Sequence, residues 1–316
     1  MDAGTGRAVR RMSRAESDEI HALAFSPDGC TLAVAVAYYS PMPVSLWDPA
    51  TGREKGRLGE DLLSVFHLAF SPDGRFLAAS GQHDAIRIWE VASGKEAYRL
   101  HAGEDGVSKI VYAPDGRRLI SLGDLTLLVW DATGLADKRR RGALSPEELR
   151  SFWDTQAGED ARRAYSAIWC LAALPEQAVA YLGDRLRPVP AIPPKQVERW
   201  IADLDDDEFA VREKATAELG KLGEAAVLPL RDGLAKKPSA EAQQRLERLV
   251  AAAEVAFASG DRLRELRAAA VLEYVGTPEA RRVLVTLAKG APAARLTREA
   301  KASLERLEKK PAGGQP

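Results

Sequence analysis

The sequence predicts a two-part fold, β then α: about three small antiparallel sheets arranged as an incomplete propeller, followed by a solenoid of short helices. Three observations predict it. Over the first 135 residues, short apolar runs alternate with clusters of Gly, Ser, Asp and Pro, as in strands joined by hairpins. Tryptophans recur in that part at a nearly fixed period. From residue 145 onward the apolar spacing is helical.

Residues 65–100 hold the clearest copy of the repeated pattern. Ser71-Pro72-Asp73-Gly74 is a hairpin turn, because Pro presets φ, Asp can bond its own backbone and Gly tolerates positive φ. Four apolar runs surround this turn and predict a four-stranded sheet. They are residues 65–70, 76–80, 85–89 and 96–100.

The same unit occurs on either side of this copy. Successive Trp residues at the end of the third strand lie 42 and 41 positions apart. Such a period, with Trp followed by an acidic residue, is typical of a propeller blade. The repeated residues are Pro27, Asp28, Gly29, Trp47 and Asp48; Pro72, Asp73, Gly74, Trp89 and Glu90; and Pro114, Asp115, Gly116, Trp130 and Asp131.

At these residues the chain resembles the WD40 repeat family, which implies a partial WD40 β-propeller of about three blades. Family blades often carry a buried tetrad of a loop His, a strand Ser or Thr, a turn Asp and the Trp. Here the loop His is replaced by Glu16, Asp61 and Gly103, and the turn Asp is clear only at Asp124, since Asp84 is displaced by one position. We therefore expect blade rigidity to depend mainly on apolar packing.

Three blades are too few to close a ring, because closed propellers use about four to eight. Residues 6–12 resemble the segment that follows each Trp-Asp pair, so the sequence begins within a repeat. The terminal sheets would leave apolar faces uncovered. We expect the chain either to self-associate through these open edges, for example by pairing two arcs into one ring, or to cover an end with its own helices.

Two segments interrupt the pattern. Residues 34–43, with a Tyr pair and several Pro, form either a contact surface or an irregular loop that covers a blade edge. The basic run at 138–141 lies in a charged linker. The expected domains are residues 1–135 for the partial propeller, 136–144 for the linker, 145–308 for the helical region and 309–316 for a flexible tail.

The helical region begins at Ser145-Pro146-Glu147-Glu148, which provides a cap, a first-turn Pro and acidic residues for a helix start. Short amphipathic segments separated by Gly or Pro then predict stacked helical hairpins. The expected helices are residues 161–173, 176–186, 195–204, 209–222, 224–235, 240–258, 261–275, 278–288 and 297–307.

Residues 205–223 resemble a HEAT-type repeat, and residues 264–280 echo it weakly. The resemblance implies that Asp206 or Asp207, together with Arg212, ties neighbouring repeats together. The whole chain resembles the WD40-repeat proteins of planctomycete bacteria, some of which are joined to a serine/threonine kinase. No kinase motif is present in this sequence.

Composition excludes several function classes. The net charge of −1 gives no overall field to recruit nucleic acid or an anionic membrane. No apolar run approaches the roughly 18 residues that span a bilayer, and no secretory signal is visible. Cys30 and Cys170 provide neither a disulfide framework nor metal spacing. We expect a cytoplasmic protein that binds no nucleic acid and no membrane.

No motif predicts catalysis, a metal or a cofactor. The four histidines, His21, His67, His83 and His101, lack the spacing of a metal site, and no phosphate-binding loop or nucleophile elbow occurs. The acidic residues at 205–208 fit helix capping better than cation binding. For the tryptophans of the helical region, Trp153, Trp169 and Trp200, packing is the expected role.

We therefore expect no enzyme, but a scaffold that binds proteins or peptides through its blade tops and its helical-repeat surface. The alternative is a regulatory fragment of a larger signalling enzyme, such as a WD40-containing serine/threonine kinase. Nucleic-acid binding ranks last, because acidic and basic residues alternate in the helical half.

Overall fold

A computed structural model describes residues 19–36, 43–59, 65–81, 85–102, 106–123, 126–133, 142–253, 257–292 and 294–309. Several expectations lie outside these residues: the leading segment 6–12, the Tyr pair, the basic run, the tail, and the roles of Glu16, Asp61, His83, Asp84, Gly103 and Asp124. The chain divides into two compact units, Met1–Cys170 and Leu171–Pro316, and each is described by itself.

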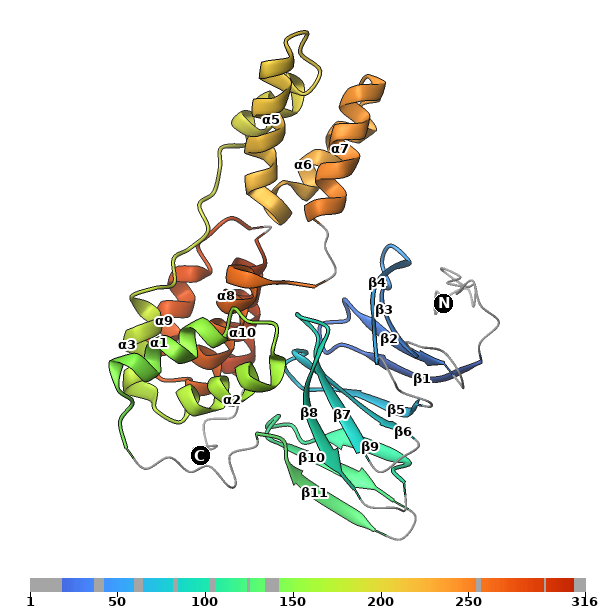
Figure 1. Ribbon diagram of the computed structural model, residues 1–316, viewed down its shortest axis with the longest axis vertical. Coiled ribbons are helices and arrows are strands. Elements are labelled where there is room, and N and C mark those ends of the chain that lie inside the picture. Colours follow the sequence, from blue (N-terminus) through green and yellow to red (C-terminus); the bar gives the residue numbers. More distant parts are fainter. Residues whose placement is uncertain are drawn as a thin grey trace. The chain divides into compact units, whose positions relative to one another are not determined.

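The first unit contains three antiparallel sheets, each with strands in sequence order, in its described residues (Figure 1). The first blade consists of β1 (Ile20–Phe25), β2 (Leu32–Val36), β3 (Val44–Asp48) and β4 (Arg53–Leu58). The second consists of β5 (Val65–Phe70), β6 (Phe76–Gly81), β7 (Ala85–Glu90) and β8 (Lys95–His101). The third consists of β9 (Lys109–Tyr112), β10 (Arg118–Leu122) and β11 (Leu127–Asp131). The expected β-then-α fold with WD40-like blades is confirmed.

The repeat extends to the irregularities of the sheets. A register shift falls between Leu46 and Trp47 in the first blade and between Ile88 and Trp89 in the second. In both cases the bulge comes immediately before the repeated Trp, and a bulge re-aims the side chains beside it. The innermost strands β1, β5 and β9 are neighbours in succession, so the blades stack in chain order.

Two helices belong to the same unit as the blades. Helix α1 (Pro146–Thr155) begins at the expected cap, and the structure adds a capping box in which Ser145 and Glu148 each accept from the other's backbone N–H. Helix α2 (Ala161–Ala172) begins at the expected residue. The sheet-containing unit thus continues beyond residue 135, and the boundary at 136–144 stays a prediction.

Helix α2 packs on the second blade through an aromatic cluster. The Tyr165 ring meets Phe76 edge-on, with ring centroids 4.9 Å apart, and also contacts Tyr98 and Trp169. Its hydroxyl donates to the carbonyl of Ala132, just after β11. Burial raises the pKa of Tyr165, since the phenolate would be poorly solvated there. This helix therefore packs on the blades, and Trp169 has the expected packing role.

The second unit is helical throughout its described residues. Its helices are α3 (Pro175–Gly183), α4 (Pro194–Asp203), α5 (Phe209–Leu222), α6 (Val227–Ala235), α7 (Ala240–Ala253), α8 (Gly260–Val275), α9 (Pro278–Leu287) and α10 (Arg295–Lys309). Several expected bounds differ from the structure; α3, for example, ends at Gly183 and not at residue 186. A 3₁₀ turn, Gly223–Ala226, precedes α6, because Gly223 has a positive φ of 52° and ends α5. Helix α7 is described as far as Ala253, and residues 257 and 258, which were expected to belong to it, are not helical.

Helices α4 to α7 form two hairpins around a shared apolar core. Helix α4 packs on α5 and α6 packs on α7, while α4 also contacts α6 and α5 contacts α7. Leu204, Leu219, Leu230 and Leu246 are buried at the centre, and Trp200 packs against them as expected. Pairwise contact of this kind is how helical hairpins stack.

Candidate interaction surfaces

The repeated turns are held by their own side chains. In the first turn, Asp28 Oδ1 accepts from Ser26 Oγ at 2.5 Å and from the N–H of Cys30 at 2.9 Å. The second turn repeats this pattern, with Asp73 accepting from Ser71 at 2.5 Å and from the N–H of Arg75 at 3.0 Å. In the third turn Ala113 replaces the Ser, and Asp115 instead accepts from Arg118.

The repeated Gly of each turn has positive φ, between 69° and 73°. This region is strained for residues with a Cβ. Each later turn also approaches the preceding one closely. A methyl group built on Gly74 would lie 3.5 Å from Pro27 Cδ, and one on Gly116 would lie 3.6 Å from Pro72 Cδ. The same Pro-to-Gly contact therefore joins the first blade to the second and the second to the third.

The acidic residue after each Trp caps the following turn. Asp48 accepts from the N–H of Ala50 at 2.8 Å, Glu90 from the Ser93 hydroxyl at 2.5 Å, and Asp131 from the N–H of Thr133 at 2.9 Å. These acids therefore act locally, in the turn that follows the third strand, which in the first two blades leads to the outer strand.

Sequence reasoning missed the serines that bond two of the Trp indoles. The N–H of Trp47 donates to Ser45 Oγ and that of Trp130 to Ser121 Oγ, both at 2.8 Å. The two serines occupy different positions: Ser45 lies two residues before Trp47 on the same strand, whereas Ser121 lies on the neighbouring strand, paired with Leu128 and diagonal to Trp130. No single sequence spacing would have found both.

Each blade has two apolar faces, which we name the leading face, toward the preceding blade, and the trailing face, toward the next. The second blade lies between two others, and both of its faces are covered. Leu68 on its leading face is 3% exposed, and Ile86 and Ile88 on its trailing face are fully buried. Burial of these aliphatic side chains is the main source of cohesion between blades.

The leading face of the first blade is open. Leu23 and Phe25, which share a face of β1, are each 60% exposed. Leu68 and Ile110, which stand at the position of Leu23 in the later blades, are 3% and 2% exposed. Leu23 and Phe25 are thus as apolar as the buried residues at equivalent positions, but no preceding sheet covers them among the described residues.

The trailing face of the third blade is open as well. Leu127 and Val129 are 63% and 60% exposed, whereas their equivalents in the second blade, Ile86 and Ile88, are fully buried. Val111 extends this surface, because Ile120 is paired directly with both Val111 and Val129. Three adjacent strands thus present one exposed apolar face, which is unusual for a soluble protein without a partner.

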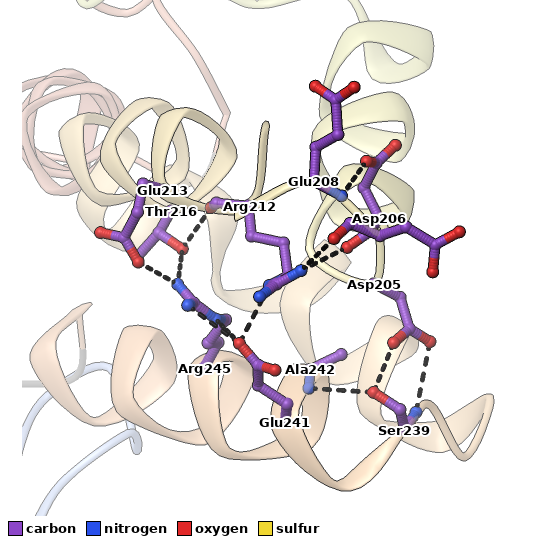
Figure 2. A network of polar contacts seen from close by, with 11 residues as sticks. Asp205, Asp206, Glu208, Arg212, Glu213, Thr216, Ser239, Glu241, Ala242 and Arg245 are labelled. Carbon is purple, nitrogen blue, oxygen red and sulfur yellow. Dashed lines mark hydrogen bonds and ion pairs between the residues drawn. The ribbon is translucent and has the colours of Figure 1, made fainter. Parts of the chain in front are cut away.

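A second candidate surface is the polar network between α5 and α7 (Figure 2). Arg212 donates through Nη1 to the carbonyls of Asp206 and Asp207, at 2.7 and 3.0 Å. Its Nε donates to Glu241 Oε1 at 3.0 Å. Arg212 therefore connects the segment before α5 to the start of α7, while the Asp206 carboxylate accepts separately from the N–H of Glu208.

Arg245 forms the other half of the network (Figure 2). It donates to Glu213 at 2.7 Å, to Thr216 at 3.0 Å and to Glu241 at 3.0 Å. The hydrogen bond from Arg245, together with the charges of Arg245 and Arg212, lowers the pKa of the Glu241 carboxyl. Two guanidinium groups thus share one carboxylate between the hairpins.

The expectation that the acidic cluster caps α5 is wrong, because no side-chain hydrogen bond caps that helix: Asp206 accepts from the N–H of Glu208, the residue before it. Asp205 instead accepts from the hydroxyl of Ser239, and that hydroxyl in turn accepts from the N–H of Ala242 in the first turn of α7. Asp205 thus supports the cap of α7, which begins 35 positions further along the sequence.

We expect Arg212→Lys to lower the free energy of unfolding of the α4–α7 hairpins by about 1–2 kcal/mol, because Lys cannot reproduce the fork of the guanidinium. Hydrogen exchange of α5 and α7 amides measures this loss. The control is Lys221→Ala on α5, which removes an exposed pair with Glu218 and should cost about 0.5 kcal/mol or less. Equal losses in the two variants would contradict a connecting role for Arg212.

The described residues contain no group of three His, Cys, Asp or Glu side chains that could hold a metal ion. His21 and His101 are exposed on strands, while His67 is half-buried and its pKa is lowered by burial and by the charge of Lys109. Within the described part of the chain, no helix is both long and apolar enough to cross a bilayer.

Comparison with known proteins points to the same sheets. Residues 55–115 match the family model of the anaphase-promoting complex subunit 4 WD40 domain. Two solved structures are similar to the chain: U3-55K and the WD40 repeats of RRP9. Each has 25% sequence identity and a TM-score of 0.36, and the match covers 39% of this chain and 38% of the solved one. Among curated proteins, none matches the chain.

Proposed function

We propose that this chain is a non-enzymatic protein–protein interaction module. The observation that carries the proposal is the pair of open blade faces, at Leu23 and Phe25 and at Leu127 and Val129. Equivalent side chains elsewhere in the chain are buried against a neighbouring blade. Covering an exposed apolar face stabilises a complex by about 25 cal/mol for each Å² removed from water.

The helical hairpins supply a second surface in this proposal. Helices α5 and α7 lie side by side and carry the Arg212 and Arg245 network, with the exposed Phe209 ring beside both guanidinium groups. Exposed aromatic and Arg side chains are frequent anchors in protein interfaces. We also propose that the helical hairpins are HEAT-like repeats and that the protein is a cytoplasmic protein of the planctomycete type.

A photo-crosslinking experiment in the source cell tests the function. A photoreactive amino acid at position 129 should yield adducts with protein, because that side chain faces the partner. The control is position 163, an exposed Arg on α2 that lies on neither open face. Adducts at 129 that far exceed those at 163 support the module. Equal adducts at both positions, or none at 129 and none at 23, would contradict it.

The alternative, a regulatory fragment of a larger signalling enzyme, also requires a docking surface. No observation among the described residues favours it over the interaction module. We therefore do not carry a second function further.

A further inference from the structure

We propose that the partner of each open blade face is a second copy of this chain. The trailing face of one copy stacks on the leading face of the other, and two copies form one six-blade ring. This inference rests on the proposed interaction function and names the partner. In this dimer each chain uses both its trailing face and its leading face, one at each of the two junctions.

The first argument is complementarity within the chain. At both internal junctions a trailing face packs against a leading face: the first blade against the second, and the second against the third. The described residues leave one face of each kind open, Leu23 and Phe25 on one side and Leu127 and Val129 on the other. A second copy therefore presents the kind of surface that covers each open face, in an arrangement that the chain already uses twice.

The second argument comes from the turns. Across successive blades, Pro27 lies within 3.5 Å of the place that a methyl group on Gly74 would take, and Pro72 within 3.6 Å of that on Gly116. Pro114 occupies the same place in the third turn. A methyl group built on Gly29 would meet no atom of the structure within 4 Å. Stacking a second copy in the same register places Pro114 of one chain against Gly29 of the other and continues the series.

The third argument fixes the number of copies. The described residues form three blades. Two copies supply six, inside the range of about four to eight blades seen in closed propellers, while three copies would supply nine. A head-to-tail contact generates a closed ring when its rotation closes and a filament when it does not. We therefore expect a dimer with two equivalent junctions.

Sedimentation velocity of the purified full chain tests the proposal. The wild type should sediment as a dimer at micromolar concentration. Val129→Arg and Leu23→Glu should each weaken dimerisation by about a hundredfold or more, because each buries an unpaired charge at both junctions. Both side chains are well exposed in the single chain, so each variant should keep the secondary structure of the wild type, while its thermal midpoint should fall because the stabilisation by dimerisation is lost.

Mixing the two variants distinguishes a head-to-tail ring from other dimers. A mixture of Val129→Arg and Leu23→Glu contains one wild-type junction and one junction of opposite charges, so a heterodimer should form where neither variant dimerises alone. A dimer that contacts itself through one face would show no such recovery. Leu228→Arg, at an exposed apolar position on α6, is the control and should dimerise like the wild type.

Three results would overturn the proposal: a monomeric wild type, assemblies of three or more copies, or a dimer that neither face variant weakens. The proposed function is judged separately. If the purified chain is monomeric while position 129 still crosslinks to another protein in the cell, the module stands and the partner is not a second copy. If position 129 crosslinks to nothing and the chain is monomeric, both proposals fail.

Discussion

Replacing Trp89 by Ala is expected to lower the free energy of unfolding of the blades by about 3–5 kcal/mol, the range for removing a buried aromatic side chain. Trp89 is 3% exposed and lies on the leading face of the second blade, directly paired with the fully buried Leu77. Truncation therefore leaves a cavity beside the junction with the first blade, where the surrounding strands have little freedom to collapse.

Hydrogen exchange followed peptide by peptide measures this effect, because it separates the blades from the helical unit and does not depend on Trp fluorescence. The amides of β6 and β7 should lose protection by the full amount. Phe66→Ala is the control in the same sheet: Phe66 is 38% exposed, so its removal should cost clearly less. A loss below about 1 kcal/mol in Trp89→Ala would mean that the blade does not depend on this side chain.

The blades could be predicted from the sequence because their determinants are local. The turn at Ser71 to Gly74 sets the hairpin through φ preferences and one Asp side chain, and the structure contains those hydrogen bonds. The Trp period then repeats the unit. The blade-to-blade contact of Pro27 with Gly74 could not be predicted, because it joins turns 47 positions apart in the sequence whose approach depends on the stacking of whole sheets.

The helical half was predicted less completely. The start of α1 could be predicted because its capping box lies within four consecutive residues, Ser145 to Glu148. The packing of α2 on the second blade was missed, although Tyr165 and Trp169 lie four positions apart and so share one face of the helix. That spacing indicates an aromatic stripe, but the surface that the stripe covers is a tertiary property.

The candidate surfaces, too, could be predicted only in part from the sequence. The sequence predicted uncovered apolar faces from the number of blades, without naming the side chains. The exposed residues Leu127 and Val129 have the same apolar character as their buried equivalents Ile86 and Ile88, so only the structure separates them. The role of Asp205 was also hidden, because its partner Ser239 lies 34 positions away.

A buried ion pair holds α8 to α10 and leads to the second large prediction. Glu273 of α8 is 2% exposed, and Arg306 of α10 donates to it through Nε at 2.9 Å and through Nη2 at 2.8 Å. We expect Arg306→Met to lower the free energy of unfolding of the helical unit by about 3–5 kcal/mol, because the substitution leaves a buried carboxylate without its two charge-assisted hydrogen bonds.

The double variant Glu273→Met with Arg306→Met separates the cost of leaving the Glu273 charge without Arg306 from the value of the pair. Replacing both charges by apolar side chains of similar volume is often neutral, so the double variant should be about as stable as the wild type and far more stable than Arg306→Met alone. Urea unfolding combined with hydrogen exchange of α8 amides measures both variants. If the double variant were as unstable as the single one, the loss would come from packing of the Arg306 stem and not from the charge left on Glu273.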